Sequence, residues 1–155
     1  QKTAYEMLIV PSGGMRYRFC DTELEEFVDY FGNVRTNYDL HMDGAAIMNF
    51  ALEAVPQTLE AVLAKTSLAR TEIDYYVFHQ ANKFMLSYLQ EKCGLQNLPF
   101  WNDVKNYGNT VSSSIPIALC DMLAENSNPE RVMIIGFGVG LSWGGCIINL
   151  SQLMR

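Results

Sequence analysis

The chain has 155 residues, of which 49% are hydrophobic and 18% are charged, a balance typical of a folded globular domain and not of a disordered chain. Its net charge of −6 and the lack of a long basic run argue against nucleic acid as a partner, because phosphate binding needs clustered Lys and Arg. No apolar stretch approaches the roughly 20 residues that a membrane-spanning helix needs, so no membrane association is expected.

The termini and the cysteines point to a cytoplasmic protein. The segment Gln1–Tyr5 lacks the features of a signal peptide and does not start with Met, which indicates a fragment or a trimmed chain. Four cysteines without C-x-x-C spacing, three of them in apolar surroundings, predict reduced thiols. They are Cys20, Cys93, Cys120 and Cys146. Because His41 and His79 are the only histidines, a metal site is not expected.

The first third of the chain has mixed patterns. Residues 5–10 favour a short strand, and residues 32–37 favour a loop. Apolar residues at helical spacing predict a helix over residues 22–30. A second helix is predicted from residue 43 to residue 66, and Pro56 should kink or split it.

Strands and helices alternate in the rest of the chain. The predicted elements are a strand over residues 75–79, a helix over 82–93, an irregular segment or short strand over 98–104, a helix over 112–124, a loop over 126–129, and strands over 131–135 and 141–150. The last two strands, joined by a glycine-rich turn, predict a hairpin. This order predicts an α/β fold, a mixed sheet with helices packed on its faces.

His79 follows the apolar run Tyr75–Phe78 directly, where a strand leads into a helix. In layered α/β folds, ligands bind at this carboxyl edge of the strands. An imidazole there can donate from Nε2 to a developing oxyanion or accept a proton near pH 7. A lone histidine is more often a buried residue with satisfied hydrogen bonds, but the polar Gln80 and Asn82 that follow it favour a functional role.

The segment Asn106–Thr110 repeats this arrangement ahead of a second helix. Gly-Asn pairs are common in turns, which is the structural alternative for Asn109. Its carboxamide can also donate to an oxyanion without titrating. The run Ser112–Ser114 begins the helix, whose positive end favours negative charge nearby. A His and an Asn on neighbouring strand–helix turns make two members of a Cys-His-Asn constellation.

The glycine-rich turn Gly136–Gly140 is compatible with a plain hairpin, and it matches no phosphate-binding motif in the required strand–helix setting. Its backbone can also approach a thioester carbonyl closely. One N–H there would serve as an oxyanion-hole donor, which is worth about 2.7–4 kcal/mol of barrier in known holes.

Three segments in this order resemble 3-oxoacyl-[acyl-carrier-protein] synthase III, a family of thiolase-like condensing enzymes: Asp74–Asn82, Asn106–Thr110 and Gly136–Gly144. The segment Leu40–Gly44 and the proline-containing helix after it are similar to the family too. The resemblance covers about residues 8–150 and matches only the C-terminal half of the family. It implies that residues 1–155 form one C-terminal domain, a thiolase-like half with a mixed five-stranded sheet, and that the N-terminal half bearing the nucleophilic Cys is absent.

The resemblance also assigns roles. His79 and Asn109 would hold the malonyl thioester carbonyl and stabilise the enolate formed on decarboxylation, which then attacks an acyl group on the Cys. The backbone N–H of Val139 would be an oxyanion donor, and Asn82 would lie near the coenzyme A arm. Acyl-CoA and malonyl-ACP are the implied substrates of fatty acid biosynthesis, with no cofactor and no metal, and the complete enzyme would be a homodimer.

The match has two departures: Tyr107 stands where the family often has His, and Val139 replaces a common glycine. None of the four cysteines follows a strand as His79 does, so all four are interpreted as structural or incidental, and the chain alone should lack condensing activity. An acidic carrier protein would need a basic patch to dock. The candidates, for which solvated surface is the alternative, are Lys83, Lys92 and Lys105.

Two other functions remain open at this point. One is a related thiolase-like acyltransferase or condensing enzyme of secondary metabolism. The other is a non-catalytic partner domain, against which the presence of both His79 and Asn109 argues.

Overall fold

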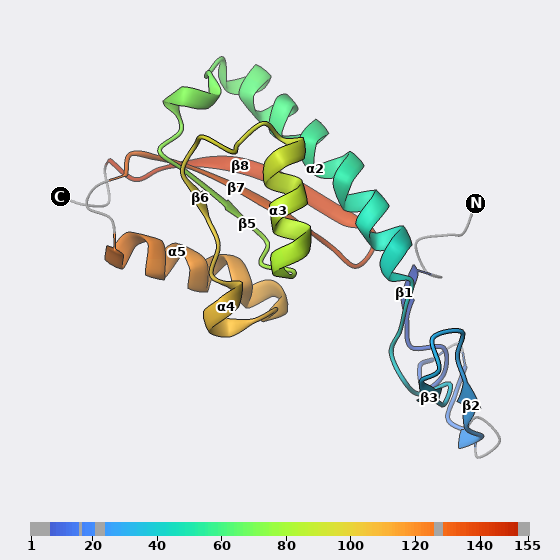
Figure 1. Cartoon of the computed structure of the whole chain (residues 1–155). Coiled ribbons are helices and arrows are strands. Elements are labelled where there is room, and N and C mark those ends of the chain that lie inside the picture. Colours follow the sequence, from blue (N-terminus) through green and yellow to red (C-terminus); the bar gives the residue numbers. More distant parts are fainter. Residues whose placement is uncertain (1–6, 16, 21–23, 126–128, 152–155) are drawn as a thin grey trace. The chain divides into compact units, whose positions relative to one another are not determined.

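The computed structural model describes residues 7–15, 17–20, 24–125 and 129–151 (Figure 1). The chain divides into two compact units, Gln1–Ile47 with Val139–Leu141, and Met48–Gly138 with Ser142–Arg155. Parts of three predicted elements lie outside the described residues, namely strand residues 5–6, helix residues 22–23 and loop residues 126–128.

The described part of the first unit contains two small antiparallel pairs of strands. Strand β1 (Leu8–Ile9) pairs with β4 (His41–Met42), and β2 (Phe27–Val28) pairs with β3 (Val34–Arg35). The helix predicted over residues 22–30 is therefore wrong in its described part. The predicted loop over residues 32–37 is interrupted by β3.

Turn chemistry explains why β2 and β3 form a hairpin and not a helix. Asp29 accepts hydrogen bonds at Oδ1 from the backbone N–H groups of Phe31 and Asn33, both at 2.9 Å. Arg35 Nε donates to Asp29 Oδ2 at 2.6 Å. The side chain and backbone N–H of Asn33 hold the pKa of Asp29 well below its usual range. An ionised Asp that collects local N–H groups stabilises a turn, and this overrides the helical spacing of the apolar residues.

The second unit contains a mixed sheet of four strands in the order β6-β5-β7-β8. They are β5 (Tyr75–Phe78), β6 (Phe100–Trp101), β7 (Arg131–Gly138) and β8 (Ser142–Asn149). Strand β5 runs parallel to both neighbours, and β7 and β8 form the predicted antiparallel hairpin. The mixed sheet is confirmed, with four strands in the described residues where five were expected.

Helices pack on both faces of this sheet (Figure 1). The described helices after residue 43 are α2 (Gly44–Thr66), α3 (Lys83–Lys92), α4 (Val104–Tyr107) and α5 (Ser114–Glu125), with 3-10 turns η2 (Arg70–Glu72) and η3 (Val111–Ser113). A Cβ at Gly136 would meet Ile115 of α5, whereas one at Gly145 would meet Thr58 of α2. Gly145 lies opposite Ile135, the chain neighbour of Gly136, so α2 and α5 cover opposite faces.

Helix α2 runs without interruption from Gly44 to Thr66, so the predicted split at Pro56 is wrong. A proline inside a helix removes one backbone hydrogen bond and costs about 3 kcal/mol. Burial on both sides of the proline offsets this cost, because Ala51, Val55 and Leu59 are all completely buried. Full burial of a Val or Leu side chain contributes roughly 1.5–3 kcal/mol.

Gly145 permits the close approach of α2 to β8. A Cβ at this position would lie 3.0 Å from Thr58 Cγ2, 3.1 Å from the Ile134 carbonyl oxygen and 3.2 Å from Ile135 Cγ1. A Cβ at the neighbouring Gly144 would meet no atom within 4 Å. Only one glycine of the pair is therefore required by packing.

The substitution Gly145→Ala is expected to lower the free energy of unfolding by about 1–3 kcal/mol. The Ile134 carbonyl oxygen belongs to the backbone of β7 and cannot move away from the added methyl group. Urea unfolding followed by circular dichroism measures the change. Gly144→Ala is the matched control and should stay within about 0.5 kcal/mol of the wild type. Equal effects of the two substitutions would contradict the packing argument.

Candidate functional site

His79 lies directly beyond the carboxyl end of β5, as predicted. Its backbone N–H donates to the Ile135 carbonyl at 2.9 Å, which ties the residue to β7. Its ring meets Phe137 edge-on, with centroids 5.3 Å apart. The side chain is half-buried, and this burial lowers the pKa of His79 from its ordinary value of 6.5. The imidazole is therefore kept neutral at pH 7.

One hydroxyl joins the His79 turn to the start of α5. Ser114 is 2% exposed, and its Oγ lies 2.7 Å from His79 Nδ1. The same oxygen accepts a hydrogen bond from the backbone N–H of Gln80 at 3.3 Å. Because Nδ1 is engaged here, Nε2 is the ring atom left to meet a ligand.

Two asparagines in this unit have the same arrangement. Asn82 is the N-cap of α3, and its Oδ1 accepts from the Met85 N–H at 2.8 Å. Asn109 Oδ1 accepts from the Val111 N–H at 2.9 Å. A backbone N–H can only donate, so the oxygen of each carboxamide must face it. Both side chains are exposed, and in each the NH₂ group remains as a donor for a ligand.

The buried Gln80 connects the ends of β5 and β6. Its Oε1 accepts from the Asp103 backbone N–H at 2.7 Å, and its Nε2 donates to the Phe78 carbonyl at 2.7 Å. The Asp103 carboxylate in turn accepts from Asn106 Nδ2 at 2.7 Å. Residue 80 is 2% exposed and residue 103 is 4% exposed, so the two hydrogen bonds of the Gln80 carboxamide form without competition from water.

The segment that carries Asn109 has an unusual backbone. Gly108, the C-cap of α4, has φ 68°, and Val111 has φ 55°. A β-branched residue rarely adopts positive φ, and this conformation costs of order 1–3 kcal/mol. The Asn109 hydrogen bond to the Val111 N–H helps to hold it. Within the described residues, the buried Oγ1 of Thr110 has no hydrogen-bond partner.

The structure places the His79 side chain in contact with Ser114 of α5. Asn109 lies a few residues before the start of the same helix in the sequence. Asn109 precedes η3, which leads into Ser114 at the start of α5. Val139 lies in the turn between β7 and β8, is 62% exposed and belongs to the N-terminal unit. Its role as an oxyanion donor stays a prediction.

Tyr107 donates to Asp121 Oδ2 at 2.6 Å, and this hydrogen bond raises the pKa of Tyr107.

The four cysteines differ in their burial. Only Cys93 of the four is buried, and burial raises the pKa of its thiol to about 12. The other three are exposed, so the apolar residues around them in the sequence do not bury their thiols. No cluster of three or more His, Cys, Asp or Glu suited to a metal ion occurs in the described residues. Within the same residues, no helix has the length and apolar character needed to cross a membrane.

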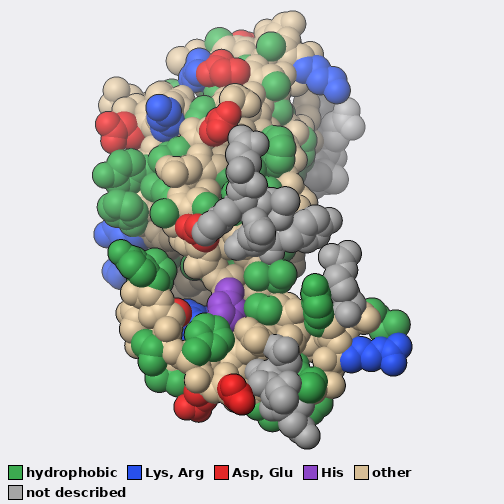
Figure 2. All heavy atoms as spheres, turned by 90° about the vertical axis from the view of Figure 1, so that its right-hand side faces the viewer, with side chains coloured by type: hydrophobic (Ala, Val, Ile, Leu, Met, Phe, Trp, Pro, Cys, Tyr) green, Lys and Arg blue, Asp and Glu red, His purple; other side chains and the backbone are tan. Residues whose placement is uncertain are grey.

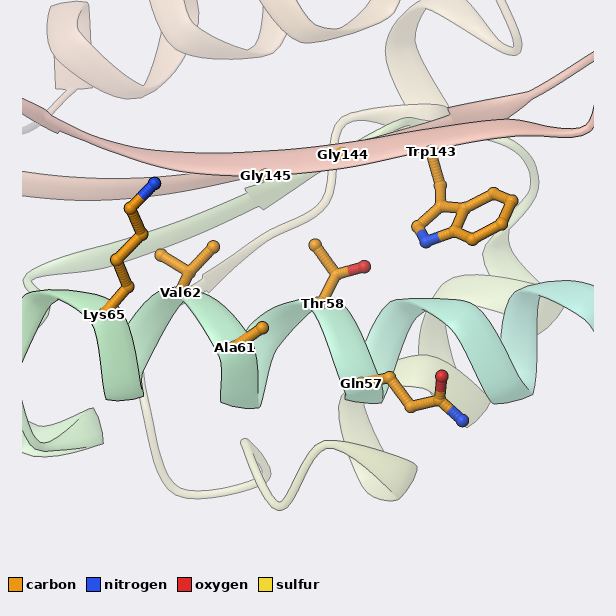
Figure 3. Close-up of a pocket in the computed structure, with 8 residues that line it drawn as sticks. All are labelled: Gln57, Thr58, Ala61, Val62, Lys65, Trp143, Gly144 and Gly145. Atoms are coloured by element: carbon orange, nitrogen blue, oxygen red, sulfur yellow. The ribbon is translucent and has the colours of Figure 1, made fainter.

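A groove of about 400 Å³ lies between α2 and β8 (Figure 3). Figure 3 shows side chains of α2 directed toward Trp143, Gly144 and Gly145 of β8. None of the candidate site residues lines this groove. The groove is therefore distinct from the candidate site at the end of β5.

Large hydrophobic side chains are exposed in both units. Phe84 and Tyr88, one turn apart on α3, are 66% and 47% exposed. Their ring centroids lie 4.7 Å apart. In the N-terminal unit, Tyr30 is 97% exposed and Phe31 is 76% exposed. Figure 2 shows hydrophobic side chains at the surface on one face of the molecule.

Ser114 and Gln80 carry interactions that the sequence did not reveal. The sequence identifies Ser114 only as part of a small-residue helix start, and Gln80 only as a polar neighbour of His79. The signal for Gln80 was its place in a strand–helix turn between two candidate residues. No local signal pointed to the pairing of Ser114 with His79, because the two residues are 35 positions apart.

Comparison with known proteins identifies a family for most of the second unit. The family model described as "3-Oxoacyl-[acyl-carrier-protein (ACP)] synthase III C terminal" matches residues 63–150. Beta-ketoacyl-[acyl-carrier-protein] synthase III of Lactococcus lactis subsp. cremoris is 41% identical over 116 residues, which cover 72% of this chain and 36% of that protein. The protein of the same name from Clostridium perfringens is 34% identical over 119 residues, covering 76% and 36%. The chain spans about a third of the length of these relatives.

The solved structures that are similar to this chain have the same names as the sequence relatives or closely similar ones. A crystal structure of a 3-oxoacyl-(acyl-carrier-protein) synthase III has a TM-score of 0.86 and 42% identity, covering 92% of this chain and 43% of its own. A 3-oxoacyl-(acyl-carrier protein) synthase from Burkholderia xenovorans has a TM-score of 0.77 and 34% identity, covering 92% and 40%. The predicted thiolase-like α/β half is thereby confirmed.

The substitution Gln80→Leu is expected to lower the free energy of unfolding by about 2–4 kcal/mol. It leaves the Asp103 N–H and the Phe78 carbonyl without their partner, and each buried unpaired group costs about 1–3 kcal/mol. Gln96→Leu is the matched control, because Gln96 is exposed and its hydrogen bond to the Glu91 carbonyl is long, at 3.4 Å. Urea unfolding measures both, and a Gln80→Leu variant as stable as the control would refute the connection between the two strand ends.

Proposed function

Because the chain belongs to the family of 3-oxoacyl-[acyl-carrier-protein] synthase III C-terminal domains, we propose that it is the C-terminal domain of a condensing enzyme of fatty acid biosynthesis. The proposed reaction is a decarboxylative Claisen condensation of an acyl thioester with malonyl-ACP. The observation that carries the proposal is that His79, Asn82 and Asn109 each have one polar atom held by a neighbouring group, which leaves His79 Nε2 and the two carboxamide NH₂ groups for a ligand. The named relatives favour this function over a secondary-metabolism enzyme or a non-catalytic partner.

The chemistry needs donors that stay neutral. When the bond between the malonyl carboxylate and the α-carbon breaks, CO₂ leaves. The electron pair of the broken bond stays with the α-carbon and forms an enolate with the thioester carbonyl. Negative charge then collects on the thioester oxygen. His79 Nε2 and Asn109 Nδ2 are proposed to stabilise that charge, and donors held in place do so better than water because they need not reorganise. The burial that keeps His79 neutral supports this role.

The second step joins the two substrates. The enolate carbon attacks the acyl thioester carbonyl carried by the Cys of the N-terminal half, a C–C bond forms, and the Cys thiolate leaves. The backbone N–H of Val139 is proposed to donate to the oxyanion of this step, together with the N–H of that Cys. Without the nucleophile, the present chain should not condense substrates.

The partners follow from the reaction. The substrates are proposed to be acyl-CoA and malonyl-ACP, with Asn82 near the coenzyme A arm and no cofactor beyond the thioesters. Exposed Lys83 and Lys92 on α3 and Lys105 on α4 are the proposed contacts for an acidic carrier protein. The complete enzyme is proposed to be a cytoplasmic homodimer that includes the N-terminal half.

The substitutions His79→Ala and Asn109→Ala in the complete enzyme are each expected to lower kcat for malonyl decarboxylation by at least about 100-fold, as loss of one oxyanion donor does in other enzymes. Release of CO₂ from labelled malonyl-ACP measures the effect. Asn97→Ala, which changes another exposed loop asparagine, is the control and should leave the rate unchanged. Unchanged decarboxylation in the His79→Ala enzyme would end the catalytic assignment.

The lowered pKa of His79 predicts the pH dependence of stability. In the unfolded chain His79 takes up a proton near pH 6.5, whereas the folded chain resists protonation because the ring is buried. The free energy of unfolding should therefore fall as the pH drops below about 7 toward the folded pKa. In the His79→Gln variant this fall should be smaller, whereas His41→Gln serves as the control for the loss of a histidine. Urea unfolding between pH 5 and pH 8 tests this, and identical pH profiles of the wild type and the His79→Gln variant would contradict it.

A further inference from the structure

Ser114 lies in a position that restricts what its hydroxyl can do. It is the first residue of α5, and its side chain is shielded from water at 2% exposure. Its Oγ has two partners among the described residues, His79 Nδ1 at 2.7 Å and the backbone nitrogen of Gln80 at 3.3 Å. A hydroxyl has one proton to donate and two lone pairs to accept with.

Counting protons assigns the direction of each bond. The Gln80 N–H can only donate, so it occupies a lone pair of Ser114 Oγ. The hydroxyl proton then has a single acceptor within reach in the described structure, His79 Nδ1. A neutral imidazole that accepts at Nδ1 must carry its own proton on Nε2.

The opposite tautomer is disfavoured by the same count. If Nδ1 carried the proton, Ser114 Oγ would accept from both His79 and Gln80, and the hydroxyl proton would lack an acceptor in a buried place. An unpaired buried donor is strongly unfavourable. The geometry thus selects one tautomer without any charged partner.

We propose that Ser114 is a positioning residue that holds His79 in the tautomer with its proton on Nε2. This inference rests on the proposed function, in which Nε2 donates to the developing thioester oxyanion. Ser114 does not touch the substrate; it decides whether the ring atom that faces the substrate is a donor or an acceptor. The wrong tautomer would present a lone pair to the developing negative charge.

The test uses the complete enzyme that contains this chain, labelled with ¹⁵N-histidine. Long-range ¹H–¹⁵N correlation spectra distinguish the two tautomers of a neutral ring, and loss of one signal set in a His79→Gln variant assigns that set to His79. The wild type should show Nε2–H. The Ser114→Ala enzyme should show a mixture of tautomers or a shift to Nδ1–H, and its kcat for malonyl decarboxylation should fall about tenfold with little change in KM.

The matched control is Ser113→Ala, because Ser113 is the exposed neighbour in η3 and no hydrogen bond of its hydroxyl is involved at the site. It should keep both the Nε2–H tautomer and the rate. An Nδ1–H tautomer in the wild type, or an unchanged tautomer and rate in the Ser114→Ala enzyme, would overturn the role of Ser114. Full decarboxylation by the His79→Gln enzyme would instead overturn the proposed function, whereas the tautomer readout still tests the Ser114 contact by itself.

Discussion

The candidate site depends on how the carboxyl end of β5 is held. This strand end lies beside β6 and β7, and the buried Gln80 carboxamide joins it to the backbone at Asp103, where α4 begins. On the other side, Ser114 joins the same turn to α5. Both junctions exclude water, so their hydrogen bonds are strong when made and costly when lost. The turn that carries the His79 imidazole is therefore bonded on two sides.

Neutral polar groups that are each held by a neighbouring group are the common chemical feature of the candidate site. His79, Asn82 and Asn109 each have one polar atom bonded to a nearby group, which leaves a ring nitrogen of His79 and the two carboxamide NH₂ groups for a ligand. These hydrogen bonds restrict rotation of the side chains, so the direction of the remaining polar atom is set before any ligand arrives. This is the condition under which hydrogen bonds stabilise charge that appears only during a reaction. Burial acts in the same sense, because it disfavours the charged imidazole.

The segment before α5 combines a strained backbone conformation with a hydrogen bond that stabilises it. The positive φ of Val111 is unfavourable for a β-branched residue, yet the Asn109 side chain bonds to the N–H of that same residue. Such strain persists where surrounding packing determines the backbone, and it is concentrated at functional sites. Ser114, buried at the start of α5, anchors the far end of this segment.

The amino-acid sequence by itself determined most elements of the second unit, the strand-end position of His79 and the helix-start position of Asn82, because periodicity, caps and turn residues act over a few residues. It did not reveal the β2–β3 hairpin, where the hydrogen bonds of Asp29 outweigh apolar spacing, or the continuity of α2 through Pro56, which burial against the sheet maintains. Only the tertiary structure decided that Ser114 meets His79 across 35 positions and that Gln80 meets Asp103 across 23. Contacts at such separations depend on how the strands and helices pack together, and nothing in the neighbouring residues specifies them.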